Sequence, residues 1–214
     1  ITMKNTILIL ISLLVFTGVI EGKEVTYLQD RNGVKYEINS EVGFTGKYVE
    51  LWDNGQKKVE EHLMLGKRHG LYLKWNENGQ KKHEWNYKGG KFDGLTTDWY
   101  ENGQKRDEVN YNGGKFDGLW TDWYENGQKR VELNYKNGKQ EGLQTRWYEN
   151  GQKWYERNYV DGKFDGLWTY WYENGQKSSE LNYKDGKEEG LQTRWYDNGQ
   201  KRVEVNFKDG KLVK

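Results

Sequence analysis

The dipeptide Asn-Gly recurs every 24 residues along most of this 214-residue chain. No insertion or deletion interrupts the series, which consists of Asn54-Gly55, Asn78-Gly79, Asn102-Gly103, Asn126-Gly127, Asn150-Gly151, Asn174-Gly175 and Asn198-Gly199. Asn-Gly favours tight turns between antiparallel strands. A 24-residue unit is too small to bury a core of its own, so such units stack on their neighbours. The period therefore predicts one elongated repeat domain.

One period reads as strand, turn, strand, turn. The segment 95–100 is rich in β-formers, and the following Glu101-Asn102-Gly103-Gln104 predicts a type I′ turn with both central residues at positive φ. Residues 105–111 form the second strand, and a second Gly-rich turn follows. The predicted fold is all-β: an elongated single-layer antiparallel β-meander of consecutive hairpins, with no significant helix apart from the N-terminal leader.

The assumed two-residue turn also predicts the strand register. It places Trp99 opposite Arg106 and Gly94 opposite Tyr111, so that an aromatic ring covers a strand glycine. The same pairing recurs at Gly118/Tyr135, Gly142/Tyr159, Gly166/Tyr183 and Gly190/Phe207.

Composition excludes several classes of site. The chain has no Cys, which excludes disulfides and thiolate metal ligands. Lys and Arg number 34 against 33 Asp and Glu, so no net field attracts nucleic acid or an anionic membrane surface. Aromatic residues make up 15% of the chain, which favours a folded protein over a disordered one.

The first residues differ from the repeats. A basic Met3-Lys4-Asn5 precedes the apolar run 7–16, which is the layout of a secretory signal peptide over residues 1–22. An uncleaved anchor is the alternative. We therefore expect export to the periplasm, the cell surface or the medium. Residues 23–42 are predicted to form an N-terminal capping hairpin, and residues 43–214 about seven repeats.

Several positions hold the same residue type in almost every unit, and these columns are explained first by sheet building. The Trp column (Trp75, Trp99, Trp123, Trp147, Trp171, Trp195) predicts a structural ladder in which Trp99 stacks on Arg106 and Trp147 on Trp154; an alternative is a glycan-binding ladder. The Glu108 column is expected to bond Thr97 or a neighbouring Arg. The Lys105 and Lys91 columns are expected to be solvated charges that discourage edge aggregation.

No catalytic, cofactor-binding or metal site is predicted. Seven identical copies of a carboxylate column are a poor design for an enzyme. The histidines, His62, His69 and His83, do not converge with Ser or Asp in a triad, and zinc binding by them is a weaker alternative. No Gly-rich loop precedes a helix, so nucleotide binding has no support.

Positions that break the pattern are better candidates for function. Aromatic and Arg residues, which often anchor interfaces, replace the usual residue types in units 147–172. The candidate partner-binding patch is Trp147, Trp154, Tyr155, Arg157, Trp168, Tyr170 and Trp171; ordinary drift among surface repeats is the alternative.

The unit from Tyr124 to Tyr148 resembles the bacterial variant of the MORN repeat. The stretch from Asn32 to Lys47 is similar to the N-terminal unit of the YwqK-like "antitoxin" proteins. The resemblance covers about residues 30–214. It implies consecutive hairpins in a gutter-like sheet that acts as a scaffold or protein-binding platform, and host-cell interaction is consistent with it.

These observations predict a non-enzymatic, exported protein that binds an unknown host or envelope protein, as a scaffold or an adhesion module. Glycan or cell-wall binding through the aromatic ladder and neutralisation of a cognate toxin are alternatives. The segment 211–214 shows no cap, so the last strand is open to a partner or to edge-to-edge self-association.

Overall fold

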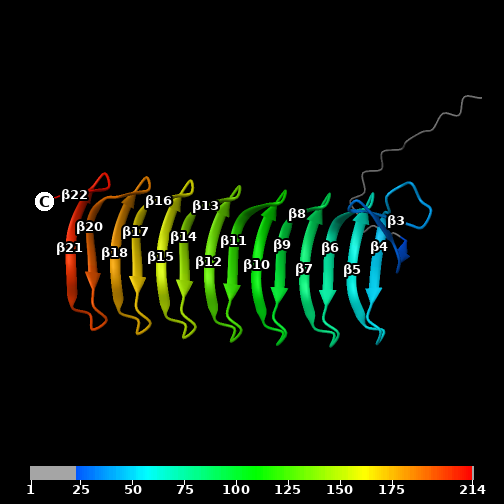
Figure 1. Cartoon of the computed structure of the whole chain (residues 1–214), viewed down its shortest axis with the longest axis horizontal. Helices are drawn as coiled ribbons and strands as arrows, with labels where there is room; N and C mark the ends of the chain where they lie inside the picture. Colours follow the sequence, from blue (N-terminus) through cyan, green and yellow to red (C-terminus); the bar gives the residue numbers. More distant parts are fainter. Residues whose placement is uncertain (1–22, 214) are drawn as a thin grey trace, which may run out of the picture.

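A computed structural model of the chain describes residues 23–213, which fold entirely into strands and turns. The predicted leader, residues 1–22, lies outside the described residues, so its role stays a prediction. Twenty strands form one sheet, and Figure 1 shows its long strands side by side in one row that follows chain order. The predicted elongated antiparallel meander is confirmed. None of the described residues belongs to a helix that could cross a membrane.

The N-terminal strands are β1 (Glu24–Val25), β2 (Gln29–Arg31) and β3 (Val34–Tyr36). β1 pairs in parallel with the first long strand of the sheet, while β2 and β3 form a separate hairpin. This hairpin is fixed to the main sheet because the Lys35 N–H donates to the Gly66 carbonyl (2.9 Å) and the Phe44 N–H to the Lys35 carbonyl (2.8 Å). Phe44 is buried beside it.

The meander consists of β4 (Gly46–Leu51), β5 (Lys57–Met64), β6 (Lys67–Trp75), β7 (Lys81–Lys88), β8 (Lys91–Phe92), β9 (Gly94–Trp99), β10 (Lys105–Asn112), β11 (Lys115–Trp123), β12 (Lys129–Lys136), β13 (Lys139–Gln140), β14 (Gly142–Trp147), β15 (Lys153–Val160), β16 (Lys163–Phe164), β17 (Gly166–Trp171), β18 (Lys177–Lys184), β19 (Lys187–Glu188), β20 (Gly190–Trp195), β21 (Lys201–Lys208) and β22 (Lys211–Val213). Short strands such as β8 are the upper ends of long ones in Figure 1, interrupted just before a glycine. Gly94, for example, has φ of 100°, a conformation that bends the strand at low cost only in glycine.

The turns at the lower edge of the sheet in Figure 1 are not of the predicted type I′. Only Gly103 of the Asn102-Gly103 pair has positive φ (84°). Its N–H donates to the Tyr100 carbonyl (3.0 Å), and the Tyr100 N–H donates to the Gln104 carbonyl (2.9 Å). This is a three-residue loop closed by a left-handed glycine, one residue longer than predicted. Pairs of left-handed residues, as type I′ requires, occur instead in the upper turns, at Asn137 and Gly138 for example.

A bulge accommodates the extra residue and changes which side chains share a face. The predicted pairing of Gly94 with Tyr111, and its four counterparts, is confirmed. Trp99, however, lies opposite Lys105, because the register shifts between Lys105 and Asp107. Arg106 therefore points to the opposite face from Trp99, and the predicted stacking of these two residues is wrong.

The two faces of the sheet differ in sequence. One face, here called the constant face, carries the columns of Leu95, Thr97, Trp99, Lys105 and Glu108, which barely change from unit to unit. The other, here called the variable face, carries the constant Tyr111 column and six changing columns, those that contain Phe92, Thr96, Asp98, Arg106, Asp107 and Val109. A buried cluster of Val59, Tyr72 and Tyr87 forms the N-terminal core on the variable face.

Contacts between units explain the constant columns. Each Lys of the Lys105 column bonds the Glu three residues later, for example Lys81 with Glu84 (2.7 Å). Of the two partners predicted for the Glu108 column, Thr and Arg, the Thr occurs in one unit, where the Thr193 hydroxyl donates to Glu204 (3.3 Å). The same Lys lies over a Trp ring of the next unit, 5.6 to 5.9 Å from its centre, at Trp75, Trp99, Trp123, Trp147 and Trp171. The Lys and Trp columns therefore act together, because each Lys packs on the Trp ring of the next unit.

The lower turns are also joined to one another. The Tyr100 hydroxyl donates to the carbonyl of Trp123 (2.8 Å), and the Asn102 amide donates to the carbonyl of Glu125 (2.9 Å). The Gln104 Oε1 lies 2.5 Å from where a Cβ at Gly127 would be placed, so the glycine makes room for the preceding Gln. The turn residues keep their identity because each one contacts the next unit.

Candidate binding face

The variable face combines a seam of aromatic rings, which is interrupted at Gln140 and Glu188, with changing residues around it. Rings stack from unit to unit, with Phe92 and Tyr111 centred 5.0 Å apart and Tyr111 and Phe116 also 5.0 Å apart. Beside the seam, the column of Val109 holds a different set of side chains: Glu61, Trp85, Leu133, Arg157, Leu181 and Val205. The seam supports the sheet, while the surrounding columns give each stretch of the face its own chemistry.

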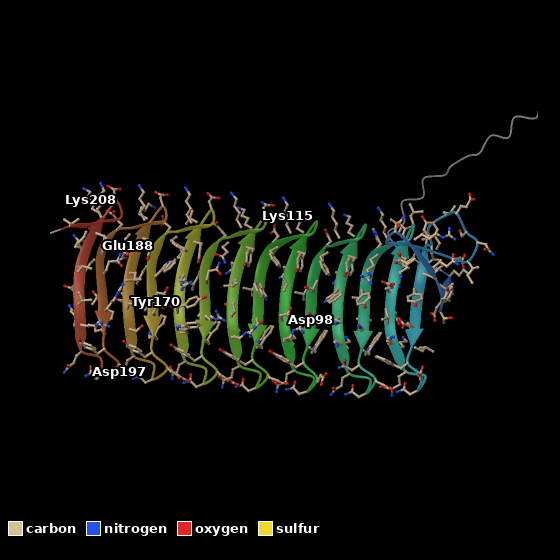
Figure 2. The ribbon with its side chains drawn as sticks, in the orientation of Figure 1. Asp98, Lys115, Tyr170, Glu188, Asp197 and Lys208 are labelled. Atoms are coloured by element: carbon tan, nitrogen blue, oxygen red, sulfur yellow. The ribbon has the colours of Figure 1, made fainter. Side chains whose placement is uncertain are left out.

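Most of the predicted patch lies together on the variable face. Arg157 is its centre: its guanidinium carbon lies 3.8 Å from the ring centre of Tyr155, 4.7 Å from that of Trp168 and 5.1 Å from that of Tyr170. Arg157 also donates to the Tyr170 hydroxyl (2.6 Å). Trp154 continues the group, with its ring 5.5 Å from that of Tyr155. Tyr170, labelled in Figure 2, is the last residue but one of β17.

Two residues of the predicted patch lie elsewhere. Trp147 and Trp171 belong to the constant face, where Lys129 and Lys153 lie over their rings. Trp147 therefore does not stack on Trp154 as predicted, because the bulge turns Trp154 to the variable face, against Tyr148. The structure brings together Trp154, Tyr155, Arg157, Trp168 and Tyr170 and separates the other two.

Beside this group the variable face is hollowed. The hollow, called the central hollow below, has a volume of about 260 Å³ and is lined by Trp120, Asp122, Arg130, Val131, Leu133, Gln140, Gln144, Arg146, Tyr155, Arg157 and Tyr159. Its lining holds one carboxylate against three guanidinium groups. Arg130 is paired with Asp122, at 2.5 Å. Within residues 23–213, neither Arg146 nor Arg157 forms an ion pair with a carboxylate.

The central hollow also gathers buried polar atoms that lack a hydrogen-bond partner within the described part of the chain. They are the donors Trp120 Nε1, Arg146 Nε and Arg157 Nε and the acceptor Gln144 Oε1. Gln144 is only 1% exposed. Buried polar groups are normally bonded, and each one left unpaired costs free energy. Four such atoms around one hollow are typical of a site that is completed by a ligand.

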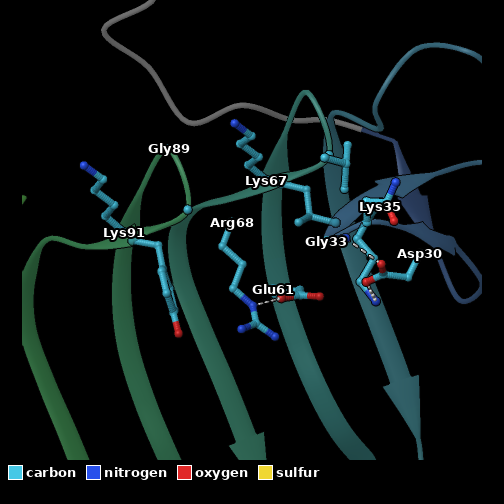
Figure 3. A pocket seen from close by; sticks show the side chains of 14 residues that line it. Asp30, Gly33, Lys35, Glu61, Lys67, Arg68, Gly89 and Lys91 are labelled. Atoms are coloured by element: carbon cyan, nitrogen blue, oxygen red, sulfur yellow. Dashed lines mark hydrogen bonds and ion pairs between the residues drawn. The ribbon is translucent and has the colours of Figure 1, made fainter. Parts of the chain in front are cut away.

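A second hollow lies where the β2–β3 hairpin meets β5–β7 (Figure 3). This N-terminal hollow has a volume of about 650 Å³. Its buried Glu61, 2% exposed, accepts a hydrogen bond of 2.6 Å from Arg68 Nε. Arg68 in turn lies over the rings of Tyr72 and Tyr87. Here the buried carboxylate has its counter-ion within the chain.

Between the hollows, three carboxylates stand in one row across neighbouring strands: Asp98, Asp107 and Asp122. Burial, and then the charges of the two flanking carboxylates, raise the pKa of Asp107 despite a hydrogen bond from Arg106. Burial opposes ionisation of Asp98 too, but hydrogen bonds from His83 (2.6 Å) and Trp85 (2.7 Å) outweigh it and lower the pKa of Asp98.

The histidines have partners within the chain, and two of them, His62 and His69, line one small hollow. His83 bonds Asp98, and His62 Nδ1 lies 3.4 Å from the Leu71 carbonyl. Within residues 23–213, no group of three or more His, Cys, Asp or Glu side chains could hold a metal ion.

A family model described as "MORN repeat variant" matches six consecutive segments, at residues 68–88, 92–112, 116–137, 140–161, 164–185 and 188–209, which together span more than half of the chain. The chain belongs to the MORN repeat variant family. Each matched MORN segment contains one lower turn and most of its two flanking strands. The hairpin β4–β5 precedes the first match and has the same register and bulge. A comparison with curated proteins found no match.

Within the MORN units, the sequence interpretation missed Trp120, Gln144, Arg146 and Tyr159 as members of a site. A signal for two of them was present: Gln-Thr-Arg occurs at residues 144–146 and again at 192–194. The structure shows that the Gln and Arg of this tripeptide lie on the variable face and line hollows in both copies.

Proposed function

We propose that this MORN repeat protein is a non-enzymatic scaffold that binds another protein along its variable face. The observation that carries the proposal is the separation of the two faces: residue type changes almost only on one of them. The constant face is occupied by contacts between units, such as the Lys and Trp pairs. The variable face is hollowed and lined with aromatic and Arg side chains, which are the usual anchors of protein interfaces.

Strand β15 provides a test with a matched control. Trp154 and Tyr155 point to the variable face, whereas Lys153 and Glu156 of the same strand point to the constant face. Proteins captured by the wild-type chain from host or envelope extracts would be compared with those captured by Trp154→Ser/Tyr155→Ser and by Lys153→Ser/Glu156→Ser. The proposal expects a partner that the first variant loses and the second keeps. A partner lost equally by both, or kept by both, would contradict it.

Export of the chain is part of the same proposal, since the residues of the leader-like segment, 3–22, have the layout of a secretory signal. Fractionation of producing cells tests it. Protein found outside the cytoplasm supports export. Protein confined to the cytoplasm contradicts export but does not bear on the proposed binding face.

A further inference from the structure

The central hollow has unmet bonding capacity of a particular kind. Its unpaired donors belong to two guanidinium groups and one indole, and its unpaired acceptor is an amide oxygen. Gln144 Nε2 donates to the Asn134 carbonyl (3.3 Å), which leaves Oε1 as the free end of that amide. A matching ligand therefore presents several acceptors with negative charge and, beside them, one donor.

The side chains that line the central hollow carry a net positive charge. Arg146 and Arg157 bring two positive charges that no carboxylate within residues 23–213 neutralises. Both guanidinium groups are already fixed by aromatic rings: Arg146 lies 5.0 Å over Trp154, and Arg157 lies over Tyr155. Guanidinium groups held in place in this way lose little further freedom when they bind a carboxylate.

We propose, building on the binding function proposed above, that the central hollow recognises an acidic segment of a protein partner. An Asp or Glu carboxylate accepts hydrogen bonds from Arg146, Arg157 and Trp120, and a main-chain N–H of the same segment donates to Gln144 Oε1. Sulfate would supply the acceptors but no donor, and it would leave the Gln144 oxygen unpaired. The combination of carboxylate and amide favours a peptide over a simple anion.

The chain contains a related hollow with a different charge: Gln192 Oε1 is unpaired there too, but the lining holds one guanidinium group, from Arg194, and one carboxylate, from Glu188. One duplication later, Gln192 and Arg194 repeat Gln144 and Arg146, but Val203 and Val205 stand in place of Tyr155 and Arg157. Arg202 is the second nearby guanidinium, and it lies over Tyr196 instead. Removing Arg194 and Arg202 changes the net charge as much as removing Arg146 and Arg157, which makes it a matched control.

The test uses the full chain and a fluorescein-labelled hexaglutamate peptide, with hexaglutamine as the neutral peptide. At low salt we expect the wild type to bind hexaglutamate and not hexaglutamine. Arg146→Gln/Arg157→Gln should weaken binding about thirtyfold, as expected for loss of charge-assisted bonds at a desolvated site. Arg194→Gln/Arg202→Gln should change it by less than about threefold, since exposed charges contribute little. Sulfate, added at the same concentration as an unlabelled hexaglutamate competitor, should not displace the labelled peptide.

Other outcomes overturn the inference. The first is a folded wild-type chain that does not bind hexaglutamate. The second is an equal loss of hexaglutamate binding in the two double variants. The third is sulfate displacing the labelled peptide as effectively as unlabelled peptide does. Arg157→Leu provides a variant that should fold, because Leu occupies the same column at Leu133 and Leu181; it should weaken the binding of hexaglutamate as well. A natural partner lost by Trp154→Ser/Tyr155→Ser but kept by Arg146→Gln/Arg157→Gln would leave the proposed function standing and overturn this inference alone.

Discussion

The two hollows of the variable face place opposite charges at the same position of the repeat. Glu61 in the N-terminal hollow and Arg157 in the central hollow occupy the same column, four periods apart. Glu61 has a cation of the chain beside it, because Arg68 bonds it at 2.6 Å. Phe164 occupies the position equivalent to Arg68 in the later unit, so Arg157 is surrounded by rings and has no counter-ion there. The same fold thus holds one charge, on Glu61, that is paired within the chain and another, on Arg157, that has no counter-ion in the described residues.

This difference separates structural from functional charge in a repeat protein. A buried pair that is complete within the chain contributes to stability only as long as both partners remain, because removal of one leaves the other desolvated. A charge without a partner contributes little to stability and is retained, if our proposal holds, for binding. Stability measurements on matched variants can therefore test which hollow holds a structural charge and which holds a charge used for binding.

The largest effect is expected at the N-terminal hollow. Arg68→Met should destabilise the fold by about 2–3 kcal/mol, since it leaves the carboxylate of Glu61 buried and unpaired. Urea unfolding and hydrogen exchange of β5–β7 would measure the loss. Lys67→Met, an exposed change in the same strand, is the control and should cost less than about 0.5 kcal/mol. Adding Glu61→Leu to Arg68→Met should restore most of the stability; equal costs for Arg68→Met and Lys67→Met would contradict a structural role for the pair.

An intermediate effect, of opposite sign, is expected in the acidic row between the hollows. The pKa of Asp107 is raised in the folded protein, so its favourable contribution is complete below the ordinary value of 3.8 and is lost as the pH rises through the raised value. Asp107→Asn removes the cost of burying a charge at this position and, with it, the repulsion from Asp98 and Asp122. It should stabilise the protein by about 0.5–1 kcal/mol at neutral pH and by almost nothing in acid.

Urea midpoints measured across the pH range would test this sign. Glu101→Gln removes the same charge from an exposed lower turn and should leave the pH profile of stability unchanged. A gain for Asp107→Asn that persists below pH 3.8, or a loss at neutral pH, would show that the row is not under repulsion.

The sequence alone predicted what depends on local pattern. The 24-residue period, the meander and the pairing of Gly94 with Tyr111 follow from turn residues and strand alternation, and the structure confirms them. The bulge at Arg106 was not predictable from the same pattern, because a three-residue loop and a two-residue loop share the Asn-Gly signal. That one residue decides the face of Trp154 and separates it from Trp147 and Trp171.

The central hollow could be predicted only in part for a different reason. Tyr155, Arg157 and Tyr170 stood out because they break the pattern, and the structure places them together. Gln144 looks like an ordinary polar residue of a strand, yet it is 1% exposed. Side chains of its own unit, such as Tyr159, and of the preceding unit, such as Trp120, lie around it, and such packing between units is not visible in the residue types of a single unit.

The smallest effect is expected at Arg157, and it tests the comparison most directly. Arg157→Leu introduces the residue found at Leu133 and Leu181 in the same column. It gives up contacts with three rings, each contributing about 0.5–1 kcal/mol, but it also removes a desolvated Nε without a partner, whose cost is about 1–3 kcal/mol. Because these terms oppose each other, we expect a net change below about 1 kcal/mol in urea unfolding, together with weaker binding of hexaglutamate. If Arg157→Leu destabilises the chain as much as Arg68→Met does, Arg157 is a structural residue like Glu61, and the two hollows do not differ in kind.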